Sequence, residues 1–359
     1  MSVRYYSIMK TLFDQNSIGN VSLKNRFIRS ATWLALASDN GRISKDFIEA
    51  HSELFEGGVA AVIIEFMRIN ARDMPFENMP GLWSDSFIAN YLPLTDKARK
   101  NAVAIFAQLG EGAYNVKSDK TILMRDVNSA TIPEIKDMVR EFALAARRAQ
   151  LAGFDGIQLH AAHGFLLSRF LSSAFNSRRD RYGNSLEKRT SLLIEILREI
   201  RKLCTANFPI GIKINSSSLG QTEEQTLQIC KILDSEQIDF IEVSGENPSR
   251  KQVRANINES YFKYFAMRLA DEVAAPVTLV GGNRSLKSMS DILNSSNIAC
   301  FSLSRPLLRE PKLINRWRFG DESPSKCISC NACFNTRGHK CVFNNCESPR
   351  ILNRKLASA

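Results

Sequence analysis

Two histidines lie three residues apart in the stretch "LHAAHGFLLSRFL", where His160 ends one apolar run and His163 precedes another. Imidazoles at this spacing suit a metal centre, a hydrogen-bonded core, or a pair of donors that bind an anionic or carbonyl oxygen. A metal needs a third ligand, and His51 and His339 lie far away without the spacing of a zinc motif. The spacing therefore disfavours a metal centre and leaves the other two interpretations open.

A second concentration of reactive side chains lies in "CISCNACFNTRGHKC", near the carboxyl end of the chain. The spacing is C-x2-C-x2-C-x7-C, formed by Cys327, Cys330, Cys333 and Cys341, and Cys346 follows. Such clustering indicates a metal site rather than a set of disulfides. Adjacent x2 spacings favour a [4Fe-4S] cluster, while a structural zinc ion and unliganded thiols are the alternatives.

Eight short apolar runs, alternating with stretches of helical periodicity, predict the elements that position these side chains. The runs are 25–32, 59–65, 102–109, 156–160, 210–214, 240–244, 277–282 and 299–304. Strands that are almost continuously apolar are typical of parallel sheets covered on both faces. The sequence therefore predicts an α/β fold, a TIM (β/α)8 barrel, followed by a Cys-rich extension.

Polar side chains gather at the carboxyl ends of these runs, where the active site of such a barrel lies. They include Glu65, Gln108, His160, Lys213 and Glu242. The last two runs end in "VGGNRS" and "SLSRP", and a helix is predicted after each. Glycines permit close backbone approach, and helix N-termini favour anions, so these loops predict a phosphate site with an arginine as charge partner.

Composition limits the class of protein. The chain has 359 residues, a formal charge of +11 and 44% hydrophobic residues, which is ordinary for an enzyme with a sizeable core. No apolar run approaches the ~20 residues of a membrane span, and the start lacks a secretory signal, so a cytoplasmic protein is expected. No nucleic-acid module accompanies the positive charge. We expect a barrel over 1–320 and a basic, Cys-rich tail over 321–359.

Several motifs together resemble the old yellow enzyme family of FMN-dependent oxidoreductases. They are "LKNRFIRSAT", "HAAHGFLLSRFLSSAFNSRRDRYGNSLEKR", "GIKIN", "VGGNR" and "SRPLLREP", in that order along the chain. The most specific part places N-x-R-x-D-x-Y-G after the two histidines. The Cys-rich stretch resembles the iron-sulfur branch related to 2,4-dienoyl-CoA reductase and trimethylamine dehydrogenase, without the FAD- and NAD-binding domains of those relatives.

The resemblance implies a TIM barrel that binds FMN at the strand ends and uses His160 and His163 to bind the oxygen of a ligand. The positions that match FMN-binding residues are Ser30, Ala31, Thr32, Gln108, Lys213, Gly282, Asn283, Ser304 and Arg305. In that scheme Gln108 binds the pyrimidine edge of the flavin, and Lys213 stabilises the anionic reduced flavin. The last four positions of the set hold the phosphate.

The substrate pocket departs from the family pattern. Trp33, Phe66 and Phe165 are the expected pocket residues. Phe165 stands where the family usually has a tyrosine proton donor, and Trp33 stands where it has threonine or cysteine. Enone reduction then needs another acid, for which Tyr114, Tyr182 and solvent are the candidates. Glu111 falls where many relatives have "HAG", which changes the polarity of the pocket.

The principal hypothesis is an FMN-dependent enzyme that transfers hydride from NAD(P)H to an α,β-unsaturated carbonyl or a related electrophile, such as a nitro compound. One alternative is an oxidative demethylase or dehydrogenase, acting on an amine, that passes electrons through an iron-sulfur cluster to an acidic partner. Another is a non-catalytic flavin and iron-sulfur electron relay. A homo-oligomer is compatible with each of these hypotheses.

Overall fold

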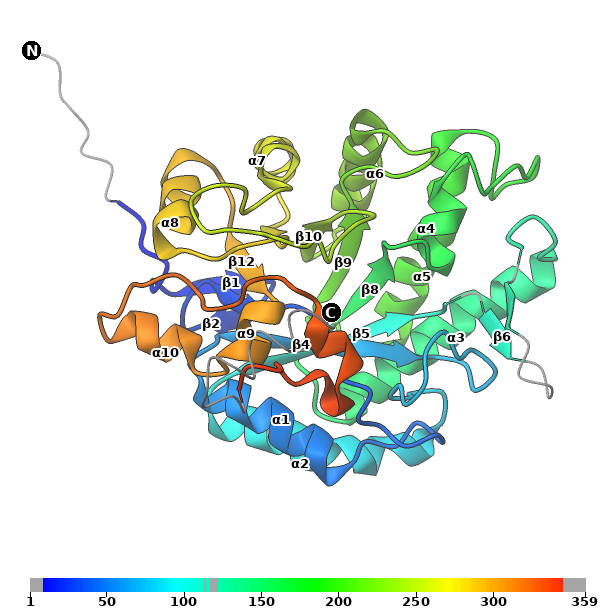
Figure 1. The fold of residues 1–359 in the computed structure, drawn as a ribbon. Coiled ribbons are helices and arrows are strands. Elements are labelled where there is room, and N and C mark those ends of the chain that lie inside the picture. The colour runs from blue at the N-terminus through cyan, green and yellow to red at the C-terminus, as the bar shows by residue number, and fades with distance from the viewer. Residues whose placement is uncertain (1–8, 113, 117–121, 125, 345–359) are drawn as a thin grey trace, which may run out of the picture.

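The computed structural model describes residues 9–112, 114–116, 122–124 and 126–344. Eight parallel strands close into a barrel in which spatial neighbours follow the order of the chain (Figure 1). These are β3 (Phe27–Arg29), β4 (Ala61–Arg68), β5 (Ala104–Gly110), β8 (Gly156–Ala161), β9 (Ile210–Asn215), β10 (Phe240–Ser244), β11 (Val277–Leu279) and β12 (Cys300–Leu303). The predicted TIM barrel is confirmed, and each strand overlaps one of the eight apolar runs.

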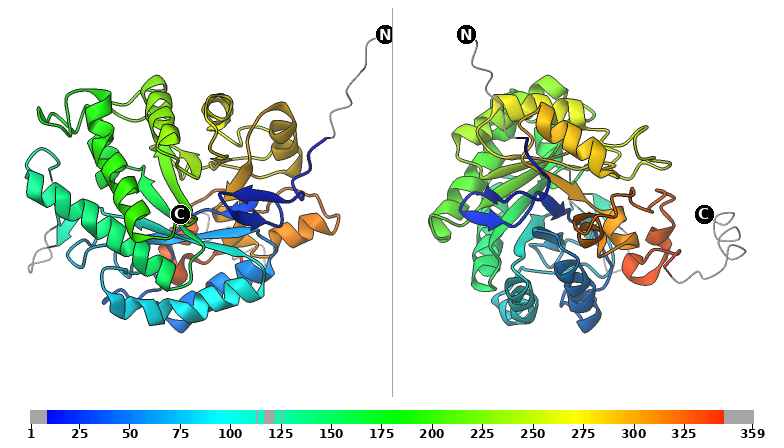
Figure 2. Two further views of the ribbon diagram at one scale, coloured as in Figure 1. Left: turned by 180° about the vertical axis from the view of Figure 1, so that it is seen from behind. Right: turned by 90° about the vertical axis from the view of Figure 1, so that its left-hand side faces the viewer.

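Helices surround the barrel on the outside (Figures 1 and 2). They are α1 (Lys45–Glu56), α2 (Ile88–Lys100), α3 (Ile132–Leu151), α4 (Leu166–Leu171), α5 (Leu186–Leu203), α6 (Glu223–Ser235), α7 (Lys263–Glu272), α8 (Leu286–Ser295), α9 (Arg305–Arg309) and α10 (Leu313–Arg318). The longest, α3, begins at a capping box in which Thr131 and Glu134 satisfy each other's backbone N–H groups. Its apolar residues at helical spacing are buried against the barrel, as the periodicity predicts.

Two hairpins lie outside the alternating pattern of strands and helices. β1 (Asn16–Ile18) pairs with β2 (Val21–Leu23), and β6 (Tyr114–Val116) pairs with β7 (Ile122–Met124) after β5. Ile18 and Leu23 of the first hairpin pack with Phe106 and Phe240, whose rings fill the amino-terminal end of the barrel. This apolar packing closes that end and leaves the opposite, carboxyl end for the functional site.

The described part of the C-terminal region packs against the barrel beside α9 (Figure 1). It contains two short 3-10 helices, η2 (Ala332–Asn335) and η3 (Arg337–His339). The remaining 3-10 helix of the described structure, η1 (Asp85–Phe87), lies elsewhere, just before α2. Arg284 Nη2 donates to Ser329 Oγ at 2.7 Å, and Arg305 donates to the side-chain oxygen of Asn331. The tail is therefore joined to the loops that follow β11 and β12. The division of the chain at residue 320 stays a prediction.

Candidate active site

A cavity of about 340 Å3 opens at the carboxyl ends of the barrel strands. Its walls come from eleven of the expected site residues and several others: Ala31, Thr32, Trp33, Phe66, Phe76, Met79, Gln108, His160, His163, Phe165, Lys213, Ser244, Pro248, Ser249, Val280, Gly281, Ser304, Arg305 and Phe334. This volume lies within the range of about 300–1,000 Å3 that is typical of small-molecule sites. The structure thus brings most of the predicted residues together around one cavity.

The backbone fixes the tautomer of His160, which lies on β8. The N–H of Ala162 donates to His160 Nδ1 at 3.2 Å, so Nδ1 is the unprotonated nitrogen and Nε2 carries the hydrogen. Burial lowers the pKa of His160 well below the ordinary value, and the neighbouring His163 and Lys213 lower it further. The side chain is therefore a neutral donor at physiological pH.

His163 follows β8 in a left-handed backbone conformation with φ of 61°. Its own N–H donates to Asn215 Oδ1 at 3.2 Å, and its Nε2 lies 2.8 Å from Ser244 Oγ. Burial and the positive charge of Lys213 lower the pKa of His163 to about 3, so this ring is also neutral. The rings of His160 and His163 meet edge to face, with centroids 4.9 Å apart.

A buried polar chain runs beneath the histidines and crosses the barrel. Lys213 Nζ donates to Ser30 Oγ at 2.8 Å and lies 3.1 Å from a carboxylate oxygen of Glu242. Gln158 Nε2 donates to the same carboxylate at 3.1 Å, and its Oε1 accepts from Gln108 Nε2 at 2.7 Å. Ser30 does not line the cavity and supports Lys213 from behind. The chain holds both the Lys213 ammonium group and the Gln108 amide at the cavity wall.

The predicted phosphate residues separate into two groups. Ser304 and Arg305 line the cavity, and Gly281 joins them with a φ of 111° that favours glycine. Gly282 and Asn283 do not line it. Asn283 Nδ2 instead donates to the carbonyls of Leu279 and Ser302, at 2.9 and 3.0 Å, and so ties β11 to β12.

Aromatic side chains form the remaining wall of the cavity. The expected residues Trp33, Phe66 and Phe165 are joined by Phe76 and Phe334, which the sequence analysis did not single out. Phe165 contacts Phe66 with centroids 5.0 Å apart, and Trp33 stacks on Phe76 at 4.8 Å. Phe76 lies in an irregular loop, and Phe334 follows Cys333 in the short 3-10 helix η2. Neither position is related to the histidines by any periodicity of the sequence.

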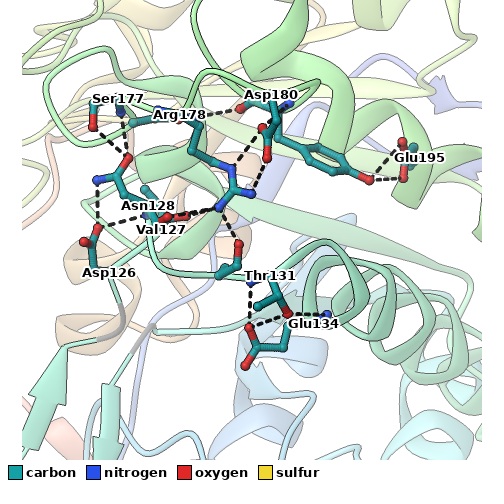
Figure 3. A network of polar contacts seen from close by, with 12 residues as sticks. Asp126, Val127, Asn128, Thr131, Glu134, Ser177, Arg178, Asp180 and Glu195 are labelled. Atoms are coloured by element: carbon teal, nitrogen blue, oxygen red, sulfur yellow. Dashed lines mark hydrogen bonds and ion pairs between the residues drawn. The ribbon is translucent and has the colours of Figure 1, made fainter.

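The N-x-R-x-D-x-Y-G motif has a structural role in the loop that precedes α5 (Figure 3). Arg178 ion-pairs with Asp180 and donates to the carbonyl of Val127 at 2.8 Å. Tyr182 donates its hydroxyl hydrogen to Glu195 at 3.0 Å and does not line the cavity. Tyr182 is therefore held away from the cavity and is not placed to give a proton to a ligand there. The side chain of Tyr114 lies outside the described residues.

The four predicted cysteine ligands surround one small cavity. Cys327, Cys330, Cys333 and Cys341 line it together with Arg305, whose side chain also lines the larger cavity. Burial raises the pKa of Cys333 to about 11, and the neighbouring cysteines add to this shift. Among the described residues, no three His, Cys, Asp or Glu side chains lie close enough to hold a single metal ion. Cys346 lies outside the described residues.

The sequence matches the NADH:flavin oxidoreductase / NADH oxidase family over residues 11–322. The chain belongs to this family. The predicted class, a flavin-dependent NAD(P)H oxidoreductase, is thereby confirmed. The iron-sulfur cluster, an acidic partner, oligomerisation and a cytoplasmic location stay predictions. No helix in the described part of the chain has the length and apolar character needed to cross a membrane.

Several proteins are similar over most of the chain. An NADH oxidase from Thermoanaerobacter brockii is 27% identical over 93% of this chain, which spans 54% of that relative. The NADH-dependent flavin oxidoreductase nadA of Aspergillus parasiticus is 30% identical over 81% of this chain and 74% of its own length. The structure of an old yellow enzyme homologue from Zymomonas mobilis superposes with a TM-score of 0.74, at 20% identity, over 95% of this chain and 98% of its own. This last likeness concerns the fold alone.

Proposed function

We propose that the protein uses FMN to transfer hydride from NAD(P)H to an α,β-unsaturated carbonyl or a related electrophile. The observation that carries this proposal is the pair of neutral imidazoles, His160 and His163, side by side on the wall of the cavity beside Lys213. Overall, enone, NAD(P)H and one proton give the saturated carbonyl and NAD(P)+.

The side chains around the cavity fit FMN. Gln108 offers an amide, Lys213 an ammonium group and Arg305 a guanidinium group, while Gly281 allows the backbone to approach a phosphate. No carboxylate belongs to the wall among the described residues, which suits a ligand that carries a phosphate and becomes more anionic on reduction. When bound, FMN supplies the hydride acceptor and donor at its N5 atom.

The two histidines would bind the carbonyl oxygen of the acceptor. His160 presents Nε2–H because its Nδ1 already accepts from the backbone. If Ser244 donates its hydroxyl hydrogen to His163 Nε2, the Nδ1–H of His163 is the second donor. Hydrogen bonds to this oxygen stabilise the negative charge that develops on it when hydride reaches the β-carbon. Neutral imidazoles provide these bonds across the physiological pH range.

The α-carbon must then take a proton from a group other than residue 165. Phe165 has no acidic hydrogen, and the hydroxyl of Tyr182 is bonded to Glu195 away from the cavity. We infer that water entering the cavity supplies this proton. The slow step of acceptor reduction would therefore include proton transfer from solvent.

We also propose that the four tail cysteines bind a [4Fe-4S] cluster. The lining of one cavity by all four cysteines, together with their C-x2-C-x2-C spacing, supports this proposal. Oxidation of a cationic amine is less well supported, because the larger cavity presents Lys213 and Arg305 and no carboxylate among its described lining residues.

A screen of electron acceptors tests the proposed function. Enzyme reconstituted with FMN is mixed anaerobically with NADH or NADPH and then with enones, nitro compounds or methylated amines. Reduction of an enone or nitro compound at the expense of NAD(P)H supports the proposal. Turnover of an amine in the absence of NAD(P)H supports the oxidative alternative, and electron transfer to ferricyanide alone would support a relay.

A further inference from the structure

The C-terminal tail contributes to the wall of the cavity through two side chains. Phe334 lines the cavity, and His339 contacts Trp33, which also lines it. His339 Nδ1–H donates to the carbonyl oxygen of Trp33 at 2.6 Å, and the two rings meet edge to face with centroids 4.8 Å apart. The ring of His339 also contacts that of Phe334 edge to face at 5.5 Å. These contacts join two regions that are about 300 residues apart in the sequence.

Trp33 depends on these neighbours for its position. It lies in an irregular segment after β3, and its indole N–H has no hydrogen-bond partner within the described structure. The backbone beside it is held on the other side, where Leu34 N donates to Glu65 Oε2 at 2.6 Å. The ring itself is held by Phe76, stacked at 4.8 Å with an interplanar angle of 26°, and by His339. Removing His339 would leave the carbonyl of Trp33 without this hydrogen bond and its ring without one of its two aromatic contacts.

We propose that His339 is a positioning residue that fixes Trp33 as a flat wall of the acceptor pocket, so that the enzyme selects planar acceptors over those with substituents out of the plane. The proposal rests on the proposed function. A large rigid ring beside the bound acceptor leaves no room for a group that projects toward it. Because His339 belongs to the same loop as the cysteines, the C-terminal tail contributes to the selectivity for acceptors.

His339 is itself well placed to act as a support. The residue is 3% exposed, and its backbone N–H donates to Thr336 O at 3.0 Å. Thr336 Oγ1 lies within hydrogen-bond distance of the carbonyls of both Cys333 and Lys340, at 2.8 and 2.7 Å, and its single O–H can donate to either of them. The φ of His339 is 47°, in the left-handed region that asparagine also tolerates. Asparagine is therefore the conservative replacement, because its amide nitrogen can donate to Trp33 O as Nδ1–H does.

The test compares His339→Ala with His339→Asn and with Lys340→Ala, an exposed neighbour in the same loop. Enzyme carrying FMN is reduced with dithionite and mixed with 2-cyclohexenone or 4,4-dimethyl-2-cyclohexenone, so the result does not depend on NAD(P)H. In His339→Ala the ratio of the two reoxidation rate constants should shift toward the dimethyl compound by about 3- to 10-fold, as expected for one lost hydrogen bond. His339→Asn and Lys340→Ala should stay within about 2-fold of wild type.

Binding of a phenol gives a readout that needs no turnover. The Kd of 4-hydroxybenzaldehyde, followed by the change in flavin absorbance, should rise by about 3- to 10-fold in His339→Ala and recover in His339→Asn. An unchanged acceptor ratio and an unchanged Kd in His339→Ala would overturn the proposal. If wild type reduces neither enone, the proposed function fails, and the phenol titration alone decides the role of His339.

Discussion

Replacing Phe165 by tyrosine should give the site the acid that it lacks. The ring of Phe165 is fixed by Phe66, Phe76 and His160, whose centroids lie 5.0, 6.2 and 4.9 Å away. A tyrosine ring held by the same contacts would direct its hydroxyl to one place in the cavity. Positioned general acids contribute about 10²- to 10⁴-fold. We expect the lower end, about 10²-fold, which corresponds to about 2.7 kcal/mol of barrier.

The assay separates the two half-reactions in a stopped-flow instrument. In Phe165→Tyr, reoxidation of the reduced enzyme by 2-cyclohexenone should be faster by about 10²-fold, whereas flavin reduction by NAD(P)H should change by less than about 3-fold. A smaller solvent deuterium isotope effect should accompany the gain, because faster proton transfer limits the rate of reoxidation less. Unchanged reoxidation, together with a wild-type flavin spectrum that phenols do not perturb, would refute the assignment of this cavity to enones.

Three further predictions concern other parts of the site. Ser244→Ala should weaken phenol binding by about 5-fold without loss of FMN, because the 2.8 Å contact that orients His163 is removed; an unchanged Kd would contradict this. Burial raises the pKa of Glu65 from 4.5 to about 8, so the native state keeps a proton that the unfolded chain releases, and stability falls as pH rises between these values, by up to about 1.4 kcal/mol per unit. Urea unfolding of Glu65→Gln should lack this decline, and parallel pH profiles of variant and wild type would contradict the assignment. Anaerobically purified protein should contain about four iron atoms and four sulfides per chain, lost in Cys330→Ser, whereas one zinc per chain would refute a cluster.

The barrel could be predicted from the sequence because its strands are buried on both faces. Runs such as 59–65 and 102–109 are apolar almost throughout, and each is followed by helical periodicity. Once the barrel is predicted, the carboxyl ends of its strands must meet, which places Gln108, His160 and Lys213 around one site before any coordinates are known. The structure agrees at all three positions.

The rest of the site depends on loops, whose paths the sequence does not specify. Phe76 reaches the cavity from an irregular loop and Phe334 from the short 3-10 helix η2, and no periodicity of the sequence relates either residue to the histidines. The two adjacent glycines also show what the sequence does not predict, since Gly281 lines the cavity and Gly282 does not. Which of two adjacent glycines faces a cavity depends on the turn geometry, and composition carries no signal for it. The contact between His339 and Trp33 could not be predicted either, because the two residues are far apart in the sequence.

Anaerobic titration of the purified, FMN-loaded protein tests the central claim most directly. The flavin absorbance should bleach on addition of one equivalent of NADH or NADPH and return on addition of 2-cyclohexenone, with formation of cyclohexanone. In the double variant His160→Ala/His163→Ala, dithionite should still bleach the flavin, but its return with the enone should be slower by at least about 10²-fold, as expected when two donors to the developing charge are lost. A protein that binds no FMN, or a double variant that the enone reoxidises as fast as wild type, would contradict the account.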